Sequence, residues 1–110
     1  MDSCAAFRPK GNTSVIAAAA SAPTAIQIGG PVSGDVAIMV YNSGTVVAFL
    51  AYGPNATTAS NNAVVPIAGT PTATIPIPPG VQTFTLVGGQ FYTAVAASAT
   101  TLYITPGEGV

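Results

Sequence analysis

The chain has 110 residues, of which 49% are hydrophobic and only 5% charged, and its formal net charge is −1. An average soluble domain carries roughly 25% charged residues. The length suits one domain, the hydrophobicity argues against disorder, and no apolar run reaches the roughly 18–20 residues of a membrane-spanning helix. With so few charges, we expect neutral polar residues on part of the surface and other protein over the rest.

The first residues differ from the rest of the chain. Residues 1–13 hold three of the five charged residues and are predicted to form an extended arm, followed by a single β domain over 14–110. Arg8 and Lys10 precede "SVIAAAASA" (residues 14–22), a run too rich in alanine for a secretory signal, so we expect none. The same run predicts either a short helix or a strand.

From residue 24 onward the pattern is that of short strands. Apolar alternation predicts strands at residues 24–28, 36–42, 46–53, 63–69, 74–77, 81–87, 91–97 and 101–105. Turn residues recur about every 8–12 positions, which is typical of a small antiparallel β-sandwich, jelly-roll-like, or a barrel. "NSGT" (42–45) predicts a hairpin between the second and third of these strands. "PNATTASNN" (54–62) is predicted to be a polar loop.

Prolines mark one strand as an edge. In "IPIPPGVQTFTL" (75–86) the apolar residues alternate, but Pro76, Pro78 and Pro79 lack the N–H that a central strand needs. Residues 74–77 are therefore predicted to be an edge strand or an extended connector. A proline on an edge also blocks unwanted strand pairing.

Two strands are apolar on both faces. Residues 36–41 alternate between one apolar set and a second one that contains Met39 and Tyr41, and residues 46–52 do the same with Leu50 and Tyr52. One face of such a strand fills the core, and the other needs a cover. We predict that Met39, Tyr41, Leu50 and Tyr52 contribute to a protein interface.

The chain offers little for catalysis. It has no histidine, and its acids Asp2, Asp35 and Glu108 are far apart, so acid–base, nucleophilic and metal chemistry are all disfavoured. Cys4 is a lone cysteine without a histidine to activate it. Two cations cannot form a nucleic-acid-binding patch. The sequence predicts no enzyme activity, no cofactor, no metal, and neither a nucleic-acid nor a membrane partner.

At "VYNSGTVVAFLAYG", "IPIPPGVQTFTL" and "ATTLYITPGEGV" the chain resembles small structural virion proteins of tailed bacteriophages. The resemblance covers residues 36–110 and lies in general features, namely short strands, Gly/Pro turns, many threonines and alanines, and no histidine. It implies compact β-domains that decorate or cement the capsid, or that serve as fibre and spike modules. It also implies homo-oligomers, commonly trimers, and no catalytic residues.

Together these features predict a capsid decoration or cement protein that binds the major capsid protein, or another virion protein, and stabilises the head. Arg8 and Lys10 would meet acidic capsid groups, and the location would be the capsid surface of the virion, with the host cytoplasm during assembly. One alternative is a tail, connector or fibre component. Another is a carbohydrate-binding surface module, for which the four tyrosines (Tyr41, Tyr52, Tyr92 and Tyr103) are the candidates.

Overall fold

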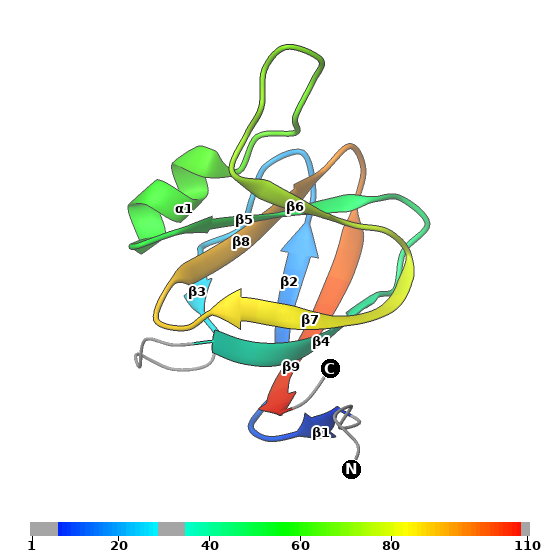
Figure 1. The fold of residues 1–110 in the computed structure, drawn as a ribbon. Helices are drawn as coiled ribbons and strands as arrows, with labels where there is room; N and C mark the ends of the chain where they lie inside the picture. Colours follow the sequence, from blue (N-terminus) through cyan, green and yellow to red (C-terminus); the bar gives the residue numbers. More distant parts are fainter. Residues whose placement is uncertain (1–6, 29–34, 109–110) are drawn as a thin grey trace.

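The computed structural model describes residues 7–28 and 35–108, which form two β-sheets packed face to face (Figure 1). Sheet A contains β1 (Arg8–Pro9), β2 (Ser14–Ala18), β4 (Asp35–Asn42), β7 (Gly80–Val87) and β9 (Thr100–Glu108). Sheet B contains β3 (Ile26–Gln27), β5 (Ala48–Gly53), β6 (Thr74–Ile77) and β8 (Phe91–Ala96). All pairs of strands within the sheets are antiparallel, which confirms the predicted all-β sandwich.

The order of the strands is that of a jelly roll. Sheet A runs β2-β9-β4-β7, with β1 beside the far end of β9, and sheet B runs β3-β8-β5-β6. The predicted hairpin of residues 36–42 and 46–53 is therefore wrong, because β4 pairs with β7 and β9 while β5 pairs with β6 and β8. Alternation identifies a strand but not its neighbour, and here the connecting turn crosses from one sheet to the other.

The side chain of Asn42 holds this crossing in place. It is almost fully buried, and its Nδ2 donates hydrogen bonds to the carbonyls of Val46 and Ile77, both at 2.9 Å. Its Oδ1 accepts from the backbone N–H of Gly44 (3.1 Å) and from Oγ1 of Thr100 (2.5 Å). A Cβ on Gly44 would collide with the side chain of Thr100, so the corner needs glycine there.

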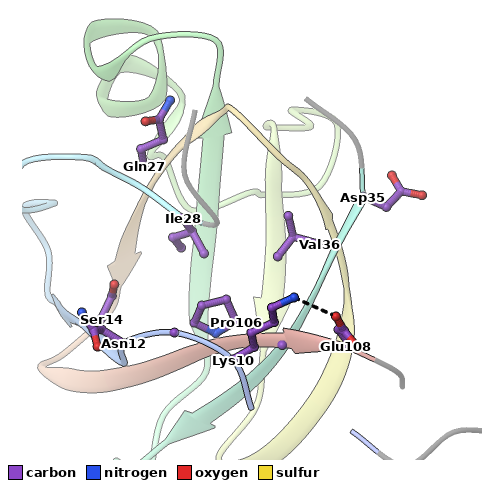
Figure 2. A pocket seen from close by; sticks show the side chains of 11 residues that line it. Lys10, Asn12, Ser14, Gln27, Ile28, Asp35, Val36, Pro106 and Glu108 are labelled. Atoms are coloured by element: carbon purple, nitrogen blue, oxygen red, sulfur yellow. Dashed lines mark hydrogen bonds and ion pairs between the residues drawn. The ribbon is translucent and has the colours of Figure 1, made fainter. Parts of the chain in front are cut away.

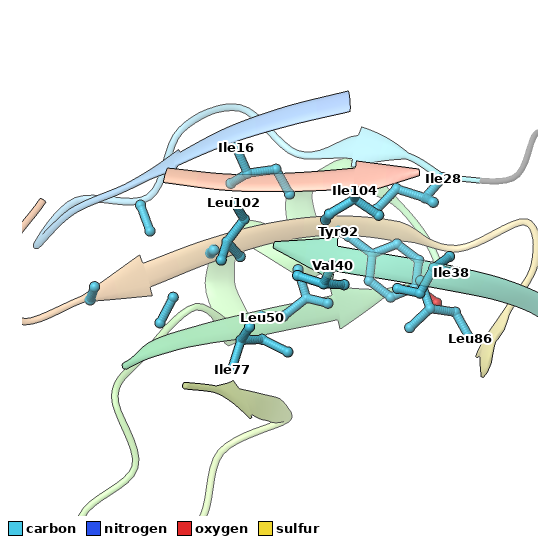
Figure 3. Packing of buried hydrophobic residues seen from close by; sticks show 14 residues of the cluster. Ile16, Ile28, Ile38, Val40, Leu50, Ile77, Leu86, Tyr92, Leu102 and Ile104 are labelled. Atoms are coloured by element: carbon cyan, nitrogen blue, oxygen red, sulfur yellow. The ribbon is translucent and has the colours of Figure 1, made fainter. Parts of the chain in front are cut away.

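The core lies between the two sheets (Figure 3). Ile38 and Val40 of sheet A face Leu50 and Tyr92 of sheet B, and all four are buried. The Tyr92 hydroxyl donates a hydrogen bond to the carbonyl of Val87 at 2.8 Å. Burial raises the pKa of Tyr92 above its ordinary value, since the charged phenolate would lose its hydration.

The outer face of sheet B is covered over β5 and β8 by the chain itself. Helix α1 (Ala56–Asn62) lies against β5 and β8, and the buried Ala59 packs beside Gly53. Residues 19–25 lie against β8, where Thr93 Oγ1 donates to the carbonyl of Pro23 (2.7 Å). The polar loop predicted at 54–62 is thus a helix, begun by Asn55, whose side chain accepts from the backbone N–H of Thr58.

Sheet B ends at β6, the strand with the prolines. Among the described residues β6 pairs with β5 alone, so the prediction of an edge strand at 74–77 is confirmed. Pro76 faces solvent while Ile77 is buried in the core, as the alternation predicted.

Residues 63–69, predicted to be a short strand, lie instead in a loop that projects between α1 and β6 (Figure 1). A single bridge between Ile67 and Thr70 closes its tip. Pro66 lacks the N–H for a longer ladder, so the apolar residues Val64 and Ile67 are left exposed.

Of the predicted arm, residues 1–6 lie outside the described residues, and residues 7–13 lie against β9. Arg8 pairs with Glu108 and Pro9 with Gly107 in the ladder of β1 and β9. The backbone N–H of Lys10 continues this contact by donating to the carbonyl of Pro106 at 2.7 Å.

Candidate functional site

A row of large apolar side chains crosses the outer face of sheet A. The strand register places Val15 (β2) opposite Tyr103 (β9), Tyr103 opposite Tyr41 (β4), and Tyr41 opposite Val81 (β7). We call these four residues the apolar row. Because directly opposite residues of antiparallel strands point to the same face, the row forms one continuous strip across the sheet.

The apolar row is open to solvent. Its exposed fractions are 56% for Val15, 40% for Tyr103, 45% for Tyr41 and 60% for Val81. The two tyrosine rings stack, with centroids 6.1 Å apart and planes inclined by 22°. Large apolar residues scattered singly on a surface are ordinary, whereas a contiguous strip of them is typical of an interaction site.

Neutral polar residues border the apolar row. The next row of the same face contains Thr105, Met39 and Thr83 in register, and Thr13 joins it through a 2.7 Å hydrogen bond between its hydroxyl and that of Thr105. On the other side, Ala17 lies opposite Thr101. The outer face of sheet A therefore has an apolar centre with hydroxyl groups beside it.

The charged side chains of the described residues gather at one end of sheet A. Asp35 begins β4 and Glu108 ends β9, and these two ends lie together because the strands are antiparallel. Glu108 accepts from Arg8 Nη2 at 2.7 Å and from Lys10 Nζ at 3.0 Å. The apolar row itself contains no charged group.

The two cations hold Glu108 in its charged form. Hydrogen bonds from Lys10 and then from Arg8 lower the pKa of the Glu108 carboxyl below its ordinary value. All three side chains are exposed, so the ion pairs add little to stability. Arg8 and Lys10, predicted to contact acidic groups of a neighbouring protein, already share an acidic partner within the chain.

The structure separates the other predicted interface residues. Met39 and Tyr41 lie on the outer face of sheet A, as predicted. Leu50 is fully buried in the core between the sheets, so its assignment to an outer face was wrong. Tyr52, on the same side of β5, is partly exposed at the strand's end, beside Tyr92.

Leu50 was misassigned because both faces of β5 are apolar and alternation does not say which one points inward. On the opposite face, Ala51 is buried too, and α1 packs against this strand, so the cover comes from the chain itself. The need for a cover was predicted for both β4 and β5. Within residues 7–28 and 35–108, the chain supplies this cover for β5 and leaves the outer face of β4 open.

Three members of the apolar row were not among the residues predicted for a protein interface, although Tyr103 was a candidate for carbohydrate binding. On the outward face of each strand, the next residues beside Val15, Tyr103 and Val81 are small or only weakly apolar, so no single strand marks a site. The available signal was side-chain size, since Val15 and Tyr103 are the bulkiest outward residues of their strands and Val81 is matched only by Val87. Only the register of four strands that are distant in sequence brings them into one row.

An open hollow of about 550 Å³ lies at the charged end of the sandwich (Figure 2). Lys10, Asn12 and Glu108 line it on one side, and Ile28 and Asp35 on another.

Over residues 7–28 and 35–108, no group of three or more His, Cys, Asp or Glu side chains lies close enough together to hold a metal ion. In the same part of the chain, no helix has the length and apolar character needed to span a membrane. Comparisons with protein-family models, with curated proteins and with solved structures found no match. The function is therefore inferred from the outer face of sheet A.

Proposed function

We propose that the chain is a structural virion protein of the capsid decoration or cement type, which attaches through the outer face of sheet A. The observation that carries this proposal is the apolar row of Val15, Tyr103, Tyr41 and Val81, exposed and without charge. The partner would be the major capsid protein or another virion protein. Jelly rolls are used in viral capsids and in lectins, so the fold is compatible with this role but does not decide it.

The composition of this face suits a protein interface. Interface centres are enriched in tyrosine and methionine and depleted of charge, with polar residues at the rim. Tyr41, Tyr103 and Met39 provide such a centre, and the threonines beside them provide the rim. Each half-exposed Tyr or Val that a partner covers would contribute about 1 kcal/mol, before the cost of association.

The remaining parts of the proposal follow from the resemblance to phage virion proteins. On the capsid surface, after assembly in the host cytoplasm, the chain would act as a homo-oligomer, and the resemblance favours a trimer in the assembled particle. It would stabilise the shell by contacts alone, without catalysis. A tail, connector or fibre component would use the same face, and its low copy number per particle would distinguish it.

The test is binding of the recombinant chain to virus particles that lack it. Wild-type chain should bind and should raise the temperature at which the particle opens. The Tyr41→Ser/Tyr103→Ser variant should bind about tenfold more weakly or worse, because it loses two aromatic contacts. Tyr52→Ser removes a partly exposed tyrosine of sheet B and should bind as the wild type does.

Two results would contradict the proposal. One is the absence of the chain from purified particles when their proteins are identified by mass spectrometry. The other is equal binding by the double variant and the wild type, provided that circular dichroism shows both to be folded.

A second function is favoured by the exposed tyrosine pair itself. A sugar ring can stack on an aromatic face, and threonine hydroxyls lie beside Tyr41 and Tyr103. A carbohydrate-binding module would therefore use the same surface. Binding of isolated chain to a glycan array, lost in Tyr41→Ser/Tyr103→Ser, would support it over attachment to a capsid.

A further inference from the structure

We propose that two copies of the chain pair through strand β7, antiparallel and about a two-fold axis, so that their A sheets join into one continuous sheet. The inference rests on the edge strand of sheet A and does not require the proposed attachment to a virion, although Val81 belongs both to this strand and to the apolar row. Within the described residues, β7 pairs along one side with β4, and no strand pairs with its other side.

The β7 edge lacks the features that normally prevent pairing. Exposed edges are usually protected by proline, by charge or by short length. On the described edges, β6 carries Pro76, β1 carries Arg8 and Pro9, and β2 and β3 are short, with five and two residues. In contrast, β7 has eight residues, "GVQTFTLV", without a proline or a charge. It is the long, unprotected edge of the sandwich.

The outward side chains of β7 are self-complementary. In order, they are Val81, Thr83, Thr85 and Val87, and all four are exposed. An antiparallel pair centred on Phe84 places Val81 opposite Val87 of the second copy, and Thr83 opposite Thr85 of the second copy. The two-fold axis repeats both pairs. Like-with-like Val and Thr pairs are favourable across strands, and no charges oppose each other.

Neighbouring registers match less well. Residues that oppose each other directly must point to the same face, so the register can shift only in steps that keep odd positions opposite odd ones. A shift in either direction sets a valine opposite a threonine and leaves the other valine beyond the end of the partner's strand. The register centred on Phe84 is the one that pairs every outward residue of β7.

In the dimer, the inward-facing side chains beside β7 would also be covered by the second copy. Phe84 packs against the core but stays partly exposed, and two copies of Phe84 would meet at the axis. A hollow of about 280 Å³ opens between the sheets near this edge, lined by Tyr52, Ile75, Leu86 and Tyr92 among others. A second β7 would lie across this opening and shield these apolar side chains from water.

The experiment uses charge at the paired threonines, with the complete chain in each variant. Thr83→Lys/Thr85→Lys sets like charges opposite each other twice across the axis, and should weaken the dimer about tenfold or more. Thr83→Lys/Thr85→Glu changes the same positions but sets opposite charges against each other, and should restore the dimer. This restored dimer should weaken with added salt, whereas the wild-type dimer should not.

The measurement is mass in solution by light scattering over a range of concentrations. Wild type and the Lys/Glu variant should approach twice the chain mass of 10.8 kDa, and the Lys/Lys variant should stay near the monomer. Thr101→Lys/Thr105→Lys adds the same charges to the face of β9, away from the edge, and should leave the dimer intact.

Several results would overturn the dimer. They are a wild-type monomer at all concentrations, a trimer whose mass the β7 variants do not change, or a dimer that persists in the folded Lys/Lys variant. If the dimer is lost in the Thr101→Lys/Thr105→Lys variant but kept in the Thr83→Lys/Thr85→Lys variant, the contact lies on the outer face of sheet A. That result would overturn pairing through β7, and it would not contradict the proposed function.

Discussion

Asn42 uses its whole side chain to fix the corner between the sheets. Its amide N–H groups and carbonyl oxygen make four hydrogen bonds at a position that is 1% exposed. The sequence marked this asparagine only as a turn residue. Its role depends on Ile77 and Thr100, which the sequence places far away, so the turn was predicted and the buried network was not.

We predict that Asn42→Asp strongly destabilises the fold. The carboxylate keeps the shape but cannot donate to the carbonyls of Val46 and Ile77, and a buried group without its partner costs about 1–3 kcal/mol. The free energy of unfolding in denaturant should fall by about 3 kcal/mol or more. Thr100→Val removes one of the four hydrogen bonds and should cost less. Equal stability of Asn42→Asp and wild type would show that the corner does not depend on this side chain.

Glu108 makes the stability of the fold slightly dependent on pH. In the folded chain the pKa of its carboxyl lies below the ordinary value of 4.5. The contribution of the charged carboxylate to stability is therefore complete above pH 4.5, and it is lost as the pH falls through the pKa of the folded state. The melting temperatures of wild type and Glu108→Gln should therefore differ slightly at neutral pH and converge in acid. Arg8→Gln/Lys10→Gln, which leaves Glu108 without its cations, should show the same convergence. A gap that widens in acid would contradict this account.

At the scale of secondary-structure elements, the sequence predicted where several strands lie but not which strands pair. Alternation correctly predicted strands such as β7 and β8, and the prolines correctly predicted the edge at β6. Pairing was missed, since β4 and β5 are neighbours in sequence but lie in different sheets. Helix α1 was missed because "ATTASNN" has no apolar periodicity. Its local signal was Asn55, an N-cap residue, and its stability comes from packing on Gly53.

We predict that α1 depends on that cap. Asn55→Ala removes the acceptor for the backbone N–H of Thr58 and should lower the free energy of unfolding by about 1 kcal/mol. Asn55→Asp keeps an acceptor oxygen at the same place and should be close to wild type. Hydrogen exchange at the amides of Thr58 and Ala59 reports the effect directly. Unchanged exchange in Asn55→Ala would mean that packing alone holds the helix.

For the molecule as a whole, the two outer faces of the sandwich differ. The chain folds α1 and residues 19–25 over sheet B, whereas the outer face of sheet A keeps its apolar row in solvent. The low charge and the doubly apolar strands predicted that some surface needs a cover. They could not tell which sheet would be covered from within, because this depends on where the connections run. The site was therefore predicted in part, through Met39 and Tyr41.

The most direct test of the proposed function is a cryo-electron microscopy reconstruction of a virus particle with the chain bound. We predict that Tyr41 and Tyr103 contact a neighbouring protein there, while α1, which packs on the outer face of sheet B, faces solvent. A reconstruction in which the apolar row of sheet A is fully hydrated, with no neighbouring chain against it, would contradict the account.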